Sequence, residues 1–185
     1  VMEFLYGLVR IVKPLNILET GTYAGWSSAV MGKALSDNSR GRITTLEIDE
    51  YWVKQAKELH TKLGLTNFVS VEHIKSLDYV PNEQFDMVFL DSEPDVRFKE
   101  LVKFYPYLNP GGFIMIHDLH PHLGLSNQIN NGMEHWPFGD FRPHFGNLIK
   151  DHELVVVNFN TPRGFTLFYH PTVEDGAYKL LTGKI

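Results

Sequence analysis

Apolar residues along this chain gather in short runs, separated by stretches in which they recur every three or four positions. The short runs predict buried β-strands, and the helical spacing predicts amphipathic helices. The expected strands span residues 16–19, 42–47, 68–72, 85–91 and 113–117. The expected helices lie ahead of Pro14, over residues 27–35, over the apolar positions of 52–63, and after a cap at Asp95. The turn NPGG is expected to lead into the strand at 113–117.

The order of these elements predicts the fold. Strands that alternate with helices form a parallel sheet covered on both faces. Two later runs, 153–159 and 164–170, are joined only by NTPR, which is too short for a parallel crossover and predicts an antiparallel hairpin. We therefore expect an α/β fold with a doubly wound, mostly parallel seven-stranded sheet ending in a hairpin, in one domain over residues 1–185. Its ligand crevice should lie beyond the carboxyl ends of the strands.

Composition and charge narrow the class of protein. The chain has 185 residues, 43% hydrophobic and 21% charged, as in ordinary globular proteins. Its formal net charge is −5 and Lys and Arg form no stripe, which argues against nucleic acid as the main partner. It has no cysteine, so no thiolate acts as nucleophile or metal ligand. Because no apolar stretch is long enough to span a bilayer and no signal segment is visible, we expect a cytoplasmic protein with no membrane partner.

The segment ILETGTYAGWSS, residues 17–28, carries the first candidate chemistry. Gly21 and Gly25 follow the first expected strand, where glycine permits a tight turn and close approach of a ligand. Glu47 ends the second expected strand, where a carboxylate can accept hydrogen bonds from both hydroxyls of a ribose. Glu19 lies at the base of the glycine loop, where an acid would repel a pyrophosphate but suit a ligand with an amino group and a sulfonium. The pattern E-x-G-x-x-x-G differs from the nicotinamide fingerprint G-x-G-x-x-G.

With these motifs the chain resembles the class I S-adenosylmethionine-dependent methyltransferases. More narrowly it is similar to O-methyltransferases related to catechol O-methyltransferase and to the metal-dependent sugar and antibiotic-tailoring enzymes. The resemblance covers about residues 15 to 170, in the family's order and spacing. The matching stretches are ETGTYAGWS (19–27), ITTLEIDE (43–50), FDMVFLDSE (85–93) and LNPGGFIMIHD (108–118).

The resemblance implies S-adenosylmethionine as cofactor and assigns roles around the glycine loop. Gly21 and Gly25 would line the methionine part of the cofactor. Glu19 would orient the loop and the amino group of the ligand. Tyr23 and Ser27 would lie at the carboxylate end.

The resemblance also assigns the nucleoside part of the site. Glu47 would hold the ribose and Ile48 would lie against the adenine. Ser76 would contact the adenine edge, although this chain has Ile74-Lys75 where the family usually has Gly-Asp before that serine.

The resemblance further places acids at the ends of the fourth and fifth strands. Asp91 and Asp118 match positions that bind Mg²⁺ in the family. Such a metal would lower the pKa of a substrate hydroxyl. Asp91 is also a candidate contact of the cofactor. Leu119 stands where the family has its third ligand, and Pro94 stands where the catechol enzymes have a lysine base.

The stretch HDLHPH, residues 117–122, offers a substitute for these missing groups. If the chain stays extended, Asp118, His120 and His122 point the same way and form a set for Mn²⁺, Fe²⁺ or Zn²⁺. Alternatively, His120 alone is the general base. His117 is expected to be a strand residue in the core.

The resemblance leads to an O-methyltransferase acting on a hydroxyl of a small molecule, either assisted by a divalent metal or not. A cofactor-binding module without catalysis and, more remotely, a nicotinamide-dependent dehydrogenase are the alternatives. The aromatic and proline-rich segment 131–147 predicts either a pocket wall for an aromatic or sugar-ring acceptor or a hydrophobic plug at a sheet edge or homodimer contact.

Overall fold

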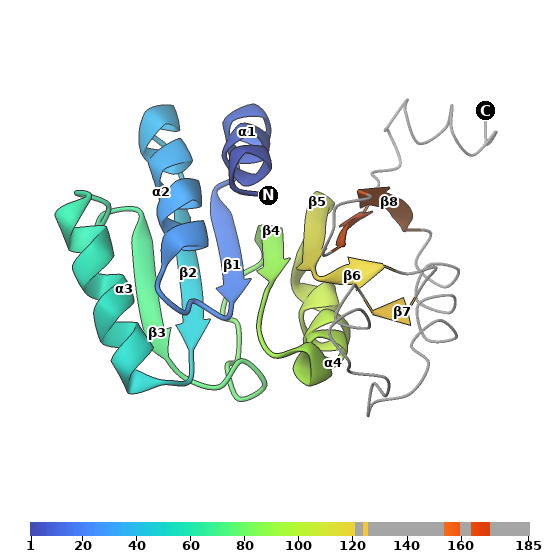
Figure 1. The fold of residues 1–185 in the computed structure, drawn as a ribbon. Coiled ribbons are helices and arrows are strands. Elements are labelled where there is room, and N and C mark those ends of the chain that lie inside the picture. The colour runs from blue at the N-terminus through green and yellow to red at the C-terminus, as the bar shows by residue number, and fades with distance from the viewer. Residues whose placement is uncertain (121–123, 126–153, 160–163, 171–185) are drawn as a thin grey trace.

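The computed structural model describes residues 1–120, 124–125, 154–159 and 164–170 of the chain. Seven strands form one sheet in the order β3-β2-β1-β4-β5-β9-β8 (Figure 1). Strands β1 to β5 run parallel to one another, whereas β9 pairs antiparallel with both β5 and β8. This confirms the doubly wound sheet and its final hairpin. The strands of the sheet are β1 (Asn16–Thr20), β2 (Arg42–Glu47), β3 (Val69–His73), β4 (Phe85–Leu90), β5 (Leu108–His117), β8 (Val155–Phe159) and β9 (Phe165–Tyr169).

Helices cover the two faces of the sheet, as Figure 1 shows. Neighbouring residues of β1 point to opposite faces, so Ile17 packs in one core and Leu18 in the other. The Ile17 core holds apolar residues of α1 (Met2–Val12) and α2 (Trp26–Asn38), and α3 (Glu50–Lys62) packs on β3. The Leu18 core holds apolar residues of α4 (Pro94–Phe104). The short 3-10 helix η1 (Tyr105–Tyr107) follows α4. Full burial of such a side chain stabilises the fold by about 1.5–3 kcal/mol.

Two local predictions are wrong, each for a physical reason. Asp95 does not cap α4, because the helix begins one residue earlier at Pro94, a residue whose fixed φ suits the first helical position. The NPGG stretch is not a turn ahead of a strand, because β5 already begins at Leu108. The backbone N–H of Gly111 donates to the carbonyl oxygen of His170 at 2.6 Å, and this bond holds the glycines within the sheet.

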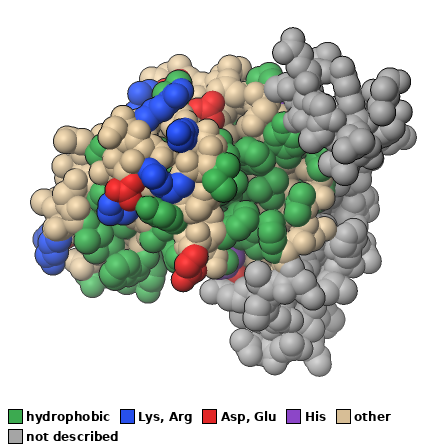
Figure 2. Space-filling model, turned by 90° about the horizontal axis from the view of Figure 1, so that it is seen from above, with side chains coloured by type: hydrophobic (Ala, Val, Ile, Leu, Met, Phe, Trp, Pro, Cys, Tyr) green, Lys and Arg blue, Asp and Glu red, His purple; other side chains and the backbone are tan. Residues whose placement is uncertain are grey.

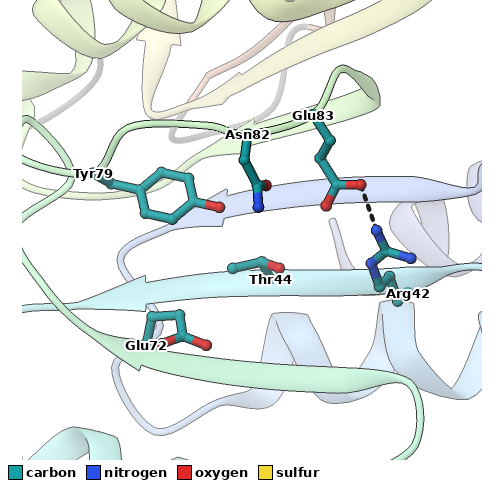
Figure 3. A pocket seen from close by; sticks show the side chains of 6 residues that line it. All are labelled: Arg42, Thr44, Glu72, Tyr79, Asn82 and Glu83. Carbon is teal, nitrogen blue, oxygen red and sulfur yellow. Dashed lines mark hydrogen bonds and ion pairs between the residues drawn. The ribbon is translucent and has the colours of Figure 1, made fainter.

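The outer surface of β2 and β3 carries an open polar groove (Figure 3). Residues 74–84 between β3 and β4 contain no helix, and Tyr79, Asn82 and Glu83 of this loop line the groove. Arg42 and Glu83 form an exposed ion pair across the groove. Its lining residues are Arg42, Thr44, Glu72, Tyr79, Asn82 and Glu83.

The surface seen in Figure 2 has basic side chains interspersed with acidic and hydrophobic ones. Within the described ranges, no helix combines the length and apolar character needed to cross a membrane. A short two-stranded ribbon, β6 (Leu119–His120) with β7 (Gly124–Leu125), follows β5 and was not predicted. Segment 131–147 and His122 lie outside the described residues.

Candidate cofactor-binding and catalytic site

A cavity of about 800 Å³ lies at the carboxyl ends of the parallel strands. Figure 1 shows why several loops meet there, because β1, β2 and β4 end at the same edge of the sheet. The strand order reverses between β1 and β4, which is where doubly wound folds bind their ligands. Of the predicted site residues, those that line the cavity are Gly21, Tyr23, Ser27, Glu47, Ile48, Ser76, Asp91 and Asp118.

The two glycines of the loop after β1 are required mainly by internal packing. Gly21 and Gly25 have φ values of 79° and 82°, which side chains rarely adopt. A Cβ on Gly21 would collide with the backbone carbonyl of Asp91. A Cβ on Gly25 would lie 2.9 Å from the Cβ of Ala56 and 3.0 Å from Nε2 of His60. Gly21 lines the cavity, but Gly25 is not among its lining residues, so its role is to seat the loop against α3.

Glu47 lies in the cavity wall and ties the glycine loop to β2. Its Oε2 accepts the backbone N–H of Tyr23 at 2.7 Å. Its Oε1 accepts those of Ile48 and Asp49 at 2.9 and 3.0 Å. A carboxylate has about four lone-pair sites, so three backbone bonds leave roughly one for a ligand hydroxyl. The predicted clasp of both ribose hydroxyls is therefore reduced to one free acceptor site.

Glu19 is placed beneath the loop rather than in the cavity wall. Its side chain is fully buried, and its Oε2 accepts the hydroxyl of Thr45 at 2.5 Å. The Thr45 hydroxyl in turn lies 2.6 Å from that of Thr22, which lines the cavity. Burial raises the pKa of Glu19 to about 7, although hydrogen bonds from Ser27 and Thr45 oppose the rise. In this structure Glu19 supports the loop through threonines and does not line the cavity.

Ser76, in the loop after β3, lines the cavity, as does its neighbour Lys75. Behind this wall lies Glu100 of α4, which is fully buried. Its Oε2 accepts hydroxyl hydrogens from Thr20 at 2.9 Å and Ser92 at 2.7 Å. Burial raises the pKa of Glu100. This acid thus links the ends of β1 and β4 to α4 and fixes the floor of the cavity.

A buried arginine lies between the acids that follow β4 and β5. Arg97 is 8% exposed, and its Nε donates to the carbonyl oxygen of Ser92 at 2.7 Å. Its Nη1 donates to the carbonyl oxygen of His117 at 2.8 Å and lies 3.4 Å from Oδ2 of Asp118. Its Nη2 lies 3.3 Å from Oδ1 of Asp91. The guanidinium therefore bridges the two carboxylates that the sequence predicted as metal ligands.

His117 completes this cluster, although the sequence placed it in the core. Its Nδ1 lies 3.0 Å from Oδ1 of Asp91 and its Nε2 3.7 Å from Oδ1 of Asp118. One ligand atom from each of the three residues falls within 4.8 Å of the others. Two carboxylates and an imidazole suit a borderline divalent metal, but Arg97 already contacts both carboxylates. The metal assignment of Asp91 and Asp118 stays a prediction.

The chain does not continue extended past β5. The prediction that Asp118, His120 and His122 point the same way assumed an extended chain, and this assumption is wrong. Asp118 has a φ of 59°, in the left-handed region, which breaks the strand alternation before His120. Leu119 is 6% exposed and packs in the core with α4 residues. His120 belongs to β6, and its side chain lies outside the described part of the chain, so its role as base stays a prediction.

Aromatic side chains form the rim of the cavity. The rings of Tyr23 and Trp52 lie 3.9 Å apart between centroids, and Tyr51 meets Trp52 edge-on at 4.9 Å. Trp26 lines the cavity and is 60% exposed. Tyr23 adopts a φ of 48°, which its backbone bond to Glu47 helps to hold. This rim offers flat apolar surface at the cavity mouth.

Residues 18–119, more than half of the chain, match the family model described as a methyltransferase domain. The chain belongs to this family. Membership confirms the resemblance to the class I S-adenosylmethionine-dependent methyltransferases. The matched residues of the methyltransferase domain include the glycine loop, Glu47 and both acids of the Arg97 cluster.

Similar proteins are methyltransferases in name, and several are named O-methyltransferases. Catechol O-methyltransferase of Niastella koreensis is 36% identical over 97 residues, which cover 49% of this chain and 43% of that protein. Tapetum-specific methyltransferase 1 of Arabidopsis thaliana is 29% identical over 117 residues, covering 60% of this chain and 49% of that protein. The chain thus spans about half the length of the curated relatives it matches.

Solved structures share the fold. The O-methyltransferase TomG of Streptomyces achromogenes, solved with S-adenosylmethionine, is 21% identical with a TM-score of 0.75, over 92% of this chain and 79% of that one. The O-methyltransferase of Bacillus cereus, solved with S-adenosylhomocysteine, is 25% identical with a TM-score of 0.70, over 91% and 80% of the two chains.

Three residues of the methyltransferase domain were missed by sequence reasoning: Arg97, His117 and Glu100. The sequence gives a weak signal for a functional role of Arg97, because this residue lies near the start of a helix, where the helix dipole disfavours a cation. His117 and Glu100 carry none, because an apolar strand and an amphipathic helix both tolerate one polar position.

Proposed function

We propose that this protein transfers the methyl group of S-adenosylmethionine to a hydroxyl of a small molecule. The observation that carries the proposal is Glu47, which faces the same cavity as the glycine loop at the strand-order reversal of a methyltransferase domain. One acceptor site of its carboxylate is open to a ribose hydroxyl. Several relatives are named O-methyltransferases, which supports oxygen as the methyl acceptor.

The cavity divides into two regions in this proposal. Tyr23, Ser27 and Glu47 would hold the cofactor, with Ile48 against its adenine and Ser76 at the adenine edge. The other end of the cavity reaches the acid and arginine cluster after β4 and β5.

The reaction is an in-line displacement, in which the acceptor oxygen bonds to the methyl carbon as the carbon–sulfur bond breaks. Holding the two reactants in line supplies much of the acceleration. The hydroxyl proton must leave, and we assign its removal to Asp118 or His120. Asp118 lines the cavity beside Arg97, whose charge favours an anionic oxygen nearby.

A specific observation favours a second function, cofactor binding without turnover. Leu119 lies in the core and Pro94 starts α4, so neither offers the ligand or the base found at these positions in the resembled enzymes. The nicotinamide-dependent dehydrogenase has no corresponding support in the site. One domain over residues 1–185, a cytoplasmic location, a homodimer and the absence of a nucleic-acid partner stay predictions.

Titration calorimetry with S-adenosylmethionine tests the proposal. Glu47→Gln keeps the shape of the side chain but replaces one carboxylate oxygen with a donor, which cannot accept the Tyr23 N–H or a ribose hydroxyl. Loss of a hydrogen bond to a charged group costs about 1.5–3 kcal/mol, so the affinity should fall roughly 10- to 100-fold. Glu50→Gln, an exposed change of equal charge in α3, is the matched control.

Two results would contradict the proposal at different levels. Absence of binding by the unaltered protein would remove methyl transfer altogether. Equal affinity of Glu47→Gln and the unaltered protein would remove the ribose contact. Binding without methylation of catechols, phenols and sugars would favour the second function.

A further inference from the structure

The Arg97 guanidinium is anchored to the main chain at both sides of the cluster. Its Nε bonds the carbonyl oxygen of Ser92 after β4, and its Nη1 bonds that of His117 at the end of β5. Both bonds are below 3 Å, and both carbonyls belong to backbone at the ends of sheet strands. The guanidinium is therefore part of the framework and not a mobile side chain that swings over the acids.

One fixed positive charge, Arg97, already lies between the two negative charges of Asp91 and Asp118. Asp118 is 3% exposed and Arg97 8% exposed, so their charges are screened little by water. A guanidinium also meets carboxylates with directional donors, which makes it well suited to such a buried pair. A divalent cation between Asp91 and Asp118 would lie beside this fixed positive charge. At an effective dielectric constant of about 20, that repulsion lowers metal affinity by on the order of a thousand-fold or more.

The ligand count limits which metal the acids could hold. Ca²⁺ takes six to eight oxygen ligands, whereas Mg²⁺ keeps several waters and is bound through one or two carboxylates. The position after Asp118 holds Leu119, whose side chain packs in the core. Among the His, Cys, Asp and Glu side chains that the structure describes, the imidazole of His117 joins the two acids, with ligand atoms within 4.8 Å of one another.

We propose that Arg97 is the resident cation of this site and that Asp91 and Asp118 bind it in place of a divalent metal. The acids position the guanidinium, and the guanidinium supplies the positive charge at the acceptor end of the cavity. Arg97 lines the cavity, so its charge faces the space that an acceptor would occupy. If the protein transfers methyl groups as proposed above, EDTA should not slow the reaction, and this consequence rests on the proposed function. The exclusion of a metal from the site does not depend on that function.

The test is a titration with Mn²⁺ followed by electron paramagnetic resonance of the unliganded protein. The unaltered protein should leave the spectrum of free Mn²⁺ unchanged at millimolar metal. Arg97→Met keeps the length of the side chain and removes its charge, and it should bind one Mn²⁺ at least about 100-fold more tightly. Adding Asp118→Asn to that variant should abolish the binding.

Arg42→Met is the matched control, because it removes an arginine from the exposed ion pair with Glu83 (Figure 3), away from the cavity. It should behave as the unaltered protein does. Circular dichroism checks folding. If Arg97→Met does not fold, Arg97→Lys, which keeps the charge, should still exclude Mn²⁺.

Three results would overturn the proposal. The first is one-to-one binding of Mn²⁺ by the unaltered protein that Asp118→Asn abolishes. The second is a folded Arg97→Met that binds no Mn²⁺, because Arg97 would then not be what excludes the metal. The third is Mn²⁺ binding by Arg97→Lys. Calorimetry with S-adenosylmethionine on the same samples shows separately whether the proposed function fails.

Discussion

Replacing Glu19 with glutamine should stabilise the protein above neutral pH. The side chain is fully buried, and burial raises its pKa from 4.5 to about 7. A carboxyl group whose pKa is higher in the folded than in the unfolded state binds more protons when folded between those two values. The free energy of unfolding therefore falls as the pH rises from 4.5 to about 7. At about 1.4 kcal/mol per pKa unit, the ionised group costs roughly 3 kcal/mol of stability above pH 7.

Urea unfolding followed by circular dichroism, at intervals from about pH 5 to about pH 8, measures this effect. Glu19→Gln cannot ionise, so its free energy of unfolding relative to the unaltered protein should rise by up to roughly 3 kcal/mol over that range. Glu50→Gln, at an exposed position, should show no such rise. If the difference between Glu19→Gln and the unaltered protein stayed flat, the carboxyl would be ionised at all these pH values and the reasoning would be refuted.

Two further predictions concern the packing of the glycine loop. Gly25→Ala should lower the free energy of unfolding by about 1–3 kcal/mol, because φ is 82° and the new Cβ would meet Ala56. Thermal melts measure this loss. Gly7→Ala is the control, because a Cβ on Gly7 in α1 would meet open space. His60 is buried with Nε2 3.1 Å from the Gly25 carbonyl oxygen, and burial lowers its pKa. Its neutral form therefore stabilises the fold above its ordinary pKa of 6.5, and this contribution is lost as the pH falls through the folded-state pKa. Melts of His60→Asn should lose less stability than the unaltered protein on acidification, and an identical acid limb would contradict this.

Much of the fold follows from local patterns. Strand β2 has the predicted bounds, and the remaining parallel strands were located to within a few residues, except that β5 begins earlier. The hairpin of β8 and β9 followed from two apolar runs and the short connection between them. The candidate site was predicted at the carboxyl ends of the strands, where Glu47 ends β2, Ser76 lies three residues after β3 and Asp91 follows β4. Their place at the strand ends made their convergence predictable.

Contacts between distant elements decided the rest. Arg97 joins acids six residues before it and 21 after it, and only the packing of α4 beside β4 and β5 brings the three together. In the sequence, Glu19 is an acid near the end of a strand, as Glu47 is. In the structure, Thr45 and Thr22 lie between Glu19 and the cavity, so Glu19 is behind the cavity wall. Periodicity reports which residues are buried and in which element, because burial repeats with the backbone. The partner that a buried charge meets depends on how helices and strands pack, and that is a property of the tertiary structure.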